Sequence, residues 1–182
     1  MSGTVESDKL VILDRDGTLV LDRGYMDDPA LLEFEHGAAD ALKWWHEHGY
    51  RLIVITNQSG VGRGFFSVER LEEMNARLHA MVEALGVRLE RIYYCPHRPD
   101  AGCNCRKPAL GLLKQAASEL GFNPRRIVVI GDKQSDIEFG QCAGAKTILI
   151  ADDSSTLTMR AKPDLATSNL LSAARAVTTL GW

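Results

Sequence analysis

The chain has 182 residues, of which 45% are hydrophobic and 25% charged, and its formal net charge is −3 at pH 7. This composition is typical of a folded globular protein and excludes a largely disordered one, while the slightly negative charge gives no general attraction for a polyanion such as a nucleic acid. No apolar run approaches the roughly 20 residues of a membrane-spanning helix, and the N-terminus lacks the basic-then-apolar pattern of a secretory signal. We therefore expect one domain over residues 1–182 that works in the cytoplasm as a monomer, without a nucleic-acid or membrane partner.

Apolar runs alternate with amphipathic segments along the chain, which predicts β-strands alternating with α-helices. Strands are expected at residues 9–14, 51–57, 91–95, 125–132 and 146–150, with a short sixth strand at 163–166. Helices are expected at residues 37–49, 67–86, 108–121, 135–145 and 169–179. Ser67 is expected to cap the second helix. Ala38, Ala41, Leu42 and Trp45 recur at helical spacing and predict the buried face of the first.

This order of elements predicts an α/β fold, a Rossmann-like three-layer sandwich in which helices cover both faces of a mainly parallel sheet. Right-handed crossovers place the carboxyl ends of parallel strands along one edge of the sheet, where ligands bind. Polar residues leave four predicted strands at that edge: residues 14–16, residues 56–59, Cys95, and Gly131 with Asp132. We therefore expect a polar active site in the crevice that these strand ends share.

Three aspartates stand at these strand ends. Asp14 and Asp16 are separated by one residue in the segment LDRDGTL, and Asp132 follows another strand. Carboxylates this close repel one another and stay ionised only beside a cation. Oxygen ligands on loops suit Mg²⁺, which takes the rest of its shell from water and a substrate phosphate. The alternative is that the aspartates only cap turns after the strands.

Two further segments have the composition of an anion-binding site. Residues 56–59 precede a glycine-rich turn, and their amide and hydroxyl groups can form an anion-binding concavity. No Gly-Lys-Ser/Thr follows, so triphosphate hydrolysis is not expected, and a generic polar turn is the alternative. Lys107 can neutralise a phosphoryl group in transfer, and Arg106 can grip a second anionic group with its planar fork. A solvated surface pair is the alternative for these two residues.

Three of the four cysteines gather with a histidine in one segment. Cys95, His97, Cys103 and Cys105 have the spacing C-x-H-x5-C-x-C. Three thiolates and one imidazole make a closed four-coordinate set typical of structural Zn²⁺. Zinc is therefore predicted to staple the loop 95–105 and to fix the Arg-Lys pair that follows it. Reduced free thiols or a redox pair are the alternative, and Cys142 is expected to be a small buried residue.

The motifs DRDGTL, TNQSG, RKP and GDKQSD occur in this order and span most of the chain. Their combination resembles the haloacid dehalogenase (HAD) superfamily of aspartate-nucleophile phosphatases. The resemblance implies that Asp14 is the nucleophile that forms an aspartyl-phosphate, and that Asp16 is the general acid and base. It also implies that Thr56 and Lys107 hold the phosphoryl oxygens. Mg²⁺ would be bound by Asp14, the Asp16 carbonyl and Asp132, with Asp136 as an outer helper.

Within this superfamily, the zinc loop narrows the resemblance to two groups of phosphatases. One removes the 7-phosphate of D-glycero-D-manno-heptose 1,7-bisphosphate, in the synthesis of nucleotide-activated heptose for lipopolysaccharide or other surface polysaccharides. The segments LDRGY and TNQSGVGRG favour this group. The other hydrolyses histidinol phosphate, and the five residues between His97 and Cys103 match its loop spacing. A catalytically inactive, zinc-stapled binding module is the alternative from another class, although no catalytic position is missing.

The resemblance to the heptose group implies substrate contacts in two loops and around the basic pair. The implied contacts are Asp22, Arg23, Gly24, Tyr25, Thr56, Asn57, Gln58, Ser59, Arg106, Lys107 and Lys133. No insertion is long enough to form a large cap domain, so specificity is expected to come from the loops 20–28, 58–66 and 95–107. Arg106 or Arg63 is expected to meet the phosphate that is not cleaved.

Overall fold

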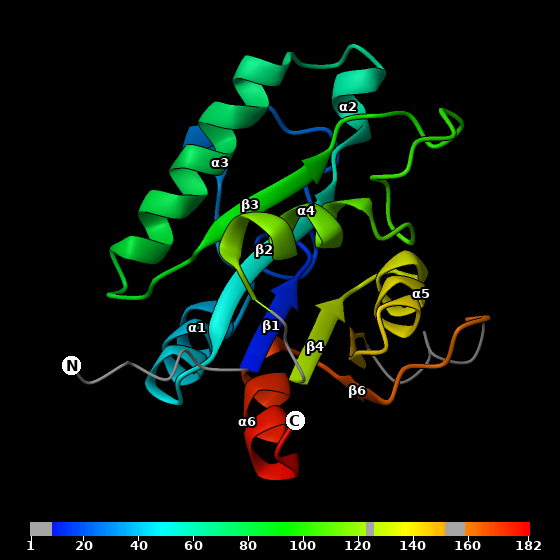
Figure 1. Ribbon diagram of the computed structural model, residues 1–182. Coiled ribbons are helices and arrows are strands. Elements are labelled where there is room, and N and C mark those ends of the chain that lie inside the picture. The colour runs from blue at the N-terminus through cyan, green and yellow to red at the C-terminus, as the bar shows by residue number, and fades with distance from the viewer. Residues whose placement is uncertain (1–8, 123–125, 152–158) are drawn as a thin grey trace.

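The computed structural model describes residues 9–122, 126–151 and 159–182, which contain a six-stranded sheet (Figure 1). The strands are β1 (Lys9–Leu13), β2 (Arg51–Asn57), β3 (Arg91–Cys95), β4 (Arg126–Gly131), β5 (Lys146–Ile150) and β6 (Leu165–Thr167). Their order across the sheet is β3-β2-β1-β4-β5-β6, and every neighbouring pair is parallel. The predicted α/β fold with a parallel sheet is confirmed.

Helices cover both faces of the sheet and complete a three-layer sandwich (Figure 1). α1 (Ala38–Glu47), α3 (Val68–Glu83) and α6 (Leu170–Leu180) pack on one face, and α4 (Gly111–Leu120) and α5 (Gln134–Cys142) pack on the other. Side chains of β1 alternate between the two cores: Val11 and Leu13 lie in the first, Leu10 and Ile12 in the second. Both faces of the strand are buried, which is why its sequence is continuously apolar.

Local sequence signals account for the position of several helices. Ser67 caps α3 as predicted, because its hydroxyl accepts a hydrogen bond of 3.2 Å from the Arg70 N–H group. The four residues predicted to form the buried face of α1 are all buried. Two short helices, η1 (Pro29–Leu31) and α2 (Ser59–Gly62), lie in the loops after β1 and β2. Among the described residues, no helix combines the length and the apolar character needed to cross a membrane.

Two expectations about the helices were wrong. α4 begins at Gly111 and not near Pro108, because the preceding residues form a turn in which the Gly111 N–H group donates to the Asn104 carbonyl oxygen at 2.9 Å. Cys142 is exposed at the end of α5, whereas Phe139, one turn earlier, is buried. A small apolar residue in a helical pattern therefore did not identify the buried face of this helix.

The topology brings two strand ends to one crevice. β1 lies between β2 and β4, and after β3 the chain returns across the sheet to form β4. The pairing of β1 with β4 continues past the strand, where the Asp14 N–H group donates to the Ile130 carbonyl oxygen at 2.9 Å. In open parallel sheets, ligands bind at such a reversal of strand order, at the carboxyl ends of the strands. In this chain, that position receives Asp14 from β1 and Asp132 from β4.

Candidate active site

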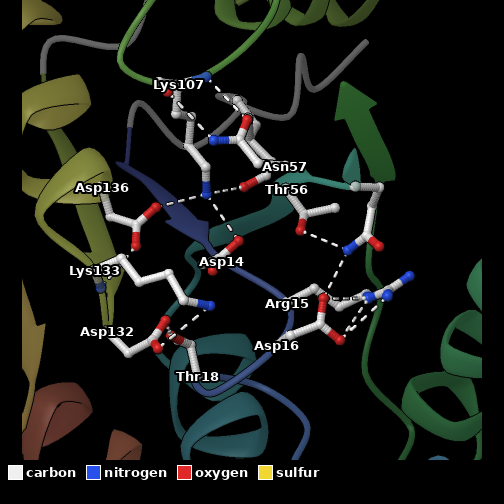
Figure 2. A network of polar contacts seen from close by, with 12 residues as sticks. Asp14, Arg15, Asp16, Thr18, Thr56, Asn57, Lys107, Asp132, Lys133 and Asp136 are labelled. Carbon is white, nitrogen blue, oxygen red and sulfur yellow. Dashed lines mark hydrogen bonds and ion pairs between the residues drawn. The ribbon is translucent and has the colours of Figure 1, made fainter. Parts of the chain in front are cut away.

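Three buried ionisable side chains meet at the carboxyl ends of β1 and β4 (Figure 2). Asp14, Lys107 and Asp136 are 6%, 4% and 1% exposed. The Lys107 ammonium group lies 2.8 Å from Asp14 Oδ1 and 2.6 Å from Asp136 Oδ1. Burial acts to lower the pKa of Lys107, but the two carboxylates outweigh burial and raise it. Lys107 is therefore a fixed positive charge beside Asp14 at neutral pH.

The two carboxylates respond differently to the shared ammonium group. Burial acts to raise the pKa of Asp14, but the charge and the hydrogen bond of Lys107 outweigh burial and bring the pKa below its ordinary value. Burial also raises the pKa of Asp136, and there the opposing effect of Lys107 is too small to reverse it. Asp14 is thus the carboxylate that is held ionised, which is the state that a nucleophile requires.

Asn57, the last residue of β2, fixes the backbone that carries Lys107. Its Oδ1 accepts a hydrogen bond from the Lys107 N–H group at 3.0 Å, and its Nδ2 donates to the Lys107 carbonyl oxygen at 3.2 Å. The Lys107 ammonium group also donates to the carbonyl oxygen of Ile55, on the same strand, at 2.6 Å. Strand β2 therefore holds both ends of this lysine, so Lys107 enters the crevice in one fixed direction.

Asp132 adds a third carboxylate to this group. One carboxylate oxygen each from Asp14, Asp132 and Asp136 lie within 4.8 Å of one another. Burial raises the pKa of Asp132 to about 7; the charges of Asp14 and Asp136 add to this effect, whereas Lys133 opposes it. Burial and the two neighbouring carboxylates thus oppose ionisation of Asp132, and a divalent cation bound beside it would favour the ionised form.

Glycines allow these carboxylates to approach the backbone. Gly17 has φ +79°, and a Cβ atom added there would lie 2.5 Å from Asp132 Oδ2. A Cβ atom at Gly131 would overlap the Asp136 carboxyl group. A side chain at either position would displace one carboxylate of the acidic group.

The Asp16 side chain is turned away from the acidic group (Figure 2). Its Oδ2 accepts hydrogen bonds from Arg15 Nε at 3.0 Å and from Gln58 Nε2 at 2.6 Å. Gln58 Nε2 also lies 3.0 Å from Thr56 Oγ1. Asp16 and Thr56 therefore share one donor, which ties the segment after β1 to the end of β2.

The predicted zinc ligands come together in the loop that follows β3. Cys95 Sγ lies 3.5 Å from Cys103 Sγ, 3.1 Å from Cys105 Sγ and 3.5 Å from His97 Nδ1. His97 Nδ1 also lies 3.2 Å from Cys105 Sγ. A tetrahedral ion with Zn–S of about 2.3 Å and Zn–N of about 2.0 Å requires ligand atoms roughly 3.5–3.8 Å apart. The four residues therefore already have nearly the spacing of a zinc site.

The thiols in this cluster differ in how readily they ionise. Burial raises the pKa of Cys95 to about 12. Burial also acts to raise the pKa of Cys103, but hydrogen bonds with Cys105 and Cys95 outweigh burial and lower the pKa to about 6. One thiolate is thus available at neutral pH, and the charge of a bound cation would favour ionisation of the other thiols.

The cysteine loop is joined to the segment after β2. The Gln58 N–H group donates to the Cys95 carbonyl oxygen at 2.8 Å, and the Gly62 N–H group donates to the Pro96 carbonyl oxygen, also at 2.8 Å. A Cβ atom at Gly62 would lie 2.8 Å from the same oxygen. The loop is therefore positioned from α2, while Lys107 at its far end is positioned from β2.

Several known proteins are similar to this chain in sequence. The HAD-hydrolase-like family matches residues 104–173. The D-glycero-beta-D-manno-heptose-1,7-bisphosphate 7-phosphatase of Haemophilus ducreyi is 37% identical over 172 residues, which cover 90% of this chain and 94% of that protein. The protein of the same name from Helicobacter pylori strain J99 is 39% identical over 147 residues, 80% of this chain and 84% of that protein. The chain belongs to this family of phosphatases, within the HAD-like hydrolases.

A solved structure extends the similarity to the fold of the family. The D,D-heptose 1,7-bisphosphate phosphatase of B. bronchiseptica, complexed with magnesium and phosphate, has a TM-score of 0.82 at 26% identity. The alignment covers 94% of this chain and 99% of that chain. The predicted membership of the HAD superfamily is confirmed, and these relatives favour the heptose group over the histidinol-phosphate group.

In this member of the family, most of the residues predicted to contact substrate line one cavity of about 380 Å³. These are Asp22, Gly24, Tyr25, Thr56, Asn57, Gln58, Ser59, Arg106, Lys107 and Lys133, and the predicted catalytic residues Asp14 and Asp16 line the same cavity. The Lys133 ammonium group lies 3.3 Å from Asp22 Oδ2 and 3.5 Å from Asp132 Oδ2, so it joins the loop after β1 to the acidic group. Burial acts to lower the pKa of Lys133, but Asp132 and the other carboxylates raise it.

Three predicted residues do not line the cavity. Arg23 pairs with Glu33 at 2.5 Å on the surface, and Arg63 is exposed. Asp132 belongs to the acidic group beside the cavity. Asn57 lines the cavity, and its amide also bonds to the backbone of Lys107.

Three further residues line the cavity: Gly60 and Phe66 lie in the loop 58–66 that was expected to set specificity, whereas Ser135 was not named by any prediction. A Cβ atom at Gly60 would overlap the Phe66 ring and lie 3.0 Å from Tyr25 Cδ1, so this glycine lets two aromatic walls close on the turn. Only its place in the glycine-rich segment could have marked it. Ser135 lies inside the GDKQSD motif, which was a usable signal for it.

Proposed function

We propose that this chain removes the 7-phosphate of D-glycero-D-manno-heptose 1,7-bisphosphate through an aspartyl-phosphate on Asp14. The observation that carries the proposal is the buried pair of Asp14 and Lys107, 2.8 Å apart, facing a polar cavity at the switch point of the sheet. An anionic carboxylate can approach a phosphate dianion only where cations offset their repulsion. The named substrate follows from family membership, since the relatives above bear the name of this reaction.

The reaction divides into two steps that use the same residues. In the first, a carboxylate oxygen of Asp14 attacks phosphorus, the bond from phosphorus to the sugar oxygen O7 breaks, and the carboxylic proton of Asp16 passes to O7. In the second, a water molecule attacks phosphorus while Asp16 takes its proton, the bond from phosphorus to the Asp14 oxygen breaks, and inorganic phosphate leaves. Lys107 and Thr56 stabilise the negative charge on the phosphoryl oxygens in both steps.

Asp14, Asp132 and the Asp16 carbonyl oxygen that the family resemblance implies would hold Mg²⁺, with Asp136 as an outer helper whose oxygens bond to Lys107 and to the Lys133 N–H group. Carboxylate oxygens of Asp14, Asp132 and Asp136 lie within 4.8 Å of one another, and burial raises the pKa of Asp132, an effect that a bound cation would oppose. When bound, Mg²⁺ would supply positive charge next to the phosphoryl group. The similar structure complexed with magnesium and phosphate supports magnesium as the cation.

Cys95, His97, Cys103 and Cys105 would hold Zn²⁺ as a structural ion, because a closed set of four protein ligands leaves no position for substrate. Its contribution is to hold the loop that ends in Arg106 and Lys107. Within the described residues, Arg106 Nη1 is a buried donor without a hydrogen-bond acceptor, although the residue lines the cavity. This favours Arg106 over the exposed Arg63 as the partner of the second phosphate.

The proposal is tested by phosphate release from heptose 1,7-bisphosphate, as both C1 anomers, and from L-histidinol phosphate, with Mg²⁺ and an Asp14→Asn control. We expect kcat/KM to favour a heptose bisphosphate by at least about 100-fold, or about 2.7 kcal/mol of transition-state discrimination. A preference for histidinol phosphate would reject the proposed substrate. Activity retained by Asp14→Asn would reject the nucleophile, and no hydrolysis of any phosphate ester would favour an inactive zinc-stapled module.

We further propose that the enzyme is a single-domain monomer that acts in the cytoplasm, where thiols stay reduced and can bind zinc. We propose that its reaction is one step in the synthesis of nucleotide-activated heptose for surface polysaccharides. Light scattering at micromolar concentration tests the first point, and a dimer mass would contradict it.

A further inference from the structure

A buried arginine separates the two proposed catalytic aspartates and has no part in the reaction described above. Arg15 is 3% exposed, although most arginines in proteins lie at the surface. A buried guanidinium group is costly unless charged partners and hydrogen bonds surround it. The partners of Arg15 therefore indicate why its charge is kept inside the protein.

Arg15 grips both oxygens of Asp16. Its Nε lies 3.0 Å from Asp16 Oδ2, and its Nη2 lies 3.1 Å from Asp16 Oδ1. Gln58 Nε2 adds a third donor, 2.6 Å from Oδ2. A planar fork that binds both carboxylate oxygens sets the plane of the carboxyl group as well as its position. The orientation of Asp16 is therefore set by its own neighbour in the chain.

The arginine is in turn anchored to the helix layer. Its Nη1 donates to Asn75 Oδ1, on α3, at 3.1 Å. Its backbone is held as well, because the Arg15 carbonyl oxygen accepts hydrogen bonds from the N–H groups of Leu19 and Val20, each at 2.9 Å. Rotation of the guanidinium group away from Asp16 would leave a buried charge unpaired.

We propose that Arg15 is the positioning residue for the proposed acid and base Asp16, and that Asn75 is its anchor. Asp16 lines the cavity, and it must meet first the leaving sugar oxygen and then the attacking water. Misplacement by about 1 Å in such a step can cost about 100-fold in rate. This inference rests on the proposed function, because it assumes that Asp16 transfers the proton.

The test compares two leaving groups in Arg15→Gln. A sugar alkoxide needs a proton to depart, whereas 4-nitrophenolate departs without one, so only the first depends on a well-placed acid. We expect kcat/KM to fall by about 30–100-fold for heptose bisphosphate and by less than about 3-fold for 4-nitrophenyl phosphate. Because a misplaced Asp16 also slows the attack of water on the aspartyl-phosphate, we expect a burst of about one nitrophenolate molecule per enzyme molecule.

Two further variants separate positioning from folding. Asn75→Ala leaves Arg15 and Asp16 intact. In this variant kcat/KM for heptose bisphosphate should fall by about 5–10-fold, while kcat/KM for 4-nitrophenyl phosphate changes little. Arg77→Gln is the same substitution at an exposed position of α3, and its kcat/KM should equal that of the wild type on both substrates. If Arg15→Gln does not fold, Asn75→Ala still decides the question.

Equal losses on both substrates would overturn the proposal, because a merely structural role does not distinguish leaving groups. Wild-type kinetics in both Arg15→Gln and Asn75→Ala would overturn it as well. A failure of the proposed function gives different results: wild-type enzyme is inactive on both substrates, or the Asp14→Asn variant stays active. Either result would remove the basis of this inference.

Discussion

Lys107→Met removes the ammonium group that lies between Asp14 and Asp136 and leaves a side chain of similar length. Coulomb's law with an effective dielectric constant of about 20 gives roughly 6 kcal/mol for each pair, at 2.8 and 2.6 Å. Much of this attraction offsets the desolvation of three buried groups. We therefore expect the free energy of unfolding to fall by about 3–5 kcal/mol, the usual cost of removing one partner of a buried ion pair.

Urea unfolding, followed by tryptophan fluorescence, measures this change in zinc-loaded protein without Mg²⁺. Lys114→Met is the matched control, since Lys114 is exposed on α4, and its effect should stay within about 0.5 kcal/mol. Asp136→Asn added to Lys107→Met should recover about 1–3 kcal/mol, because one unpaired charge is then absent. A loss below about 1 kcal/mol, or a double variant no more stable than the single one, would refute the reasoning.

Three other perturbations follow from the same contacts. Asn57→Ala removes both hydrogen bonds to the backbone of Lys107, so kcat should fall by about 10–100-fold in a folded protein; unchanged kcat would contradict this. Cys105→Ser should lower the zinc content, measured by atomic absorption, well below one ion per chain; full retention would argue against the four-ligand site. Burial acts to raise the pKa of Asp164, but Lys146 and Thr147 outweigh burial and lower it, so Asp164 stabilises the fold above its unfolded pKa. Asp164→Asn should therefore be less stable at pH 7, and denaturation at several pH values should show the difference shrinking below about pH 4; a constant difference would contradict this.

Much of the fold could be predicted because its signals are local. The continuous apolar runs of β1, β2 and β4 mark strands buried on both faces, and the spacing of residues in α1 marks a helix with one buried face. Their alternation leaves few ways to connect them other than a parallel sheet. The boundaries were less certain: α4 begins late because a turn that ends in a bond from Gly111 to Asn104 competes with the helix.

Part of the candidate site could be predicted from the sequence. The four predicted zinc ligands lie within 11 residues, from Cys95 to Cys105, so their spacing alone suggested a metal site. Asp14 and Asp132 could be assigned to one edge because both follow parallel strands. The hydrogen bonds from Asn57 to the backbone of Lys107 could not be predicted, since they join residues that lie 50 positions apart in the chain.

By itself the sequence determined the order of strands and helices, the edge where polar groups gather, and the residue types available for phosphoryl transfer and metal binding. These depend on patterns only a few residues long. The tertiary structure alone decided that Lys107 lies between Asp14 and Asp136, and that Arg15 turns away from the cavity to reach Asn75. These contacts join residues far apart in the chain, and they exist because the crossovers of the sheet bring β1, β4, α3 and the cysteine loop together around one strand end.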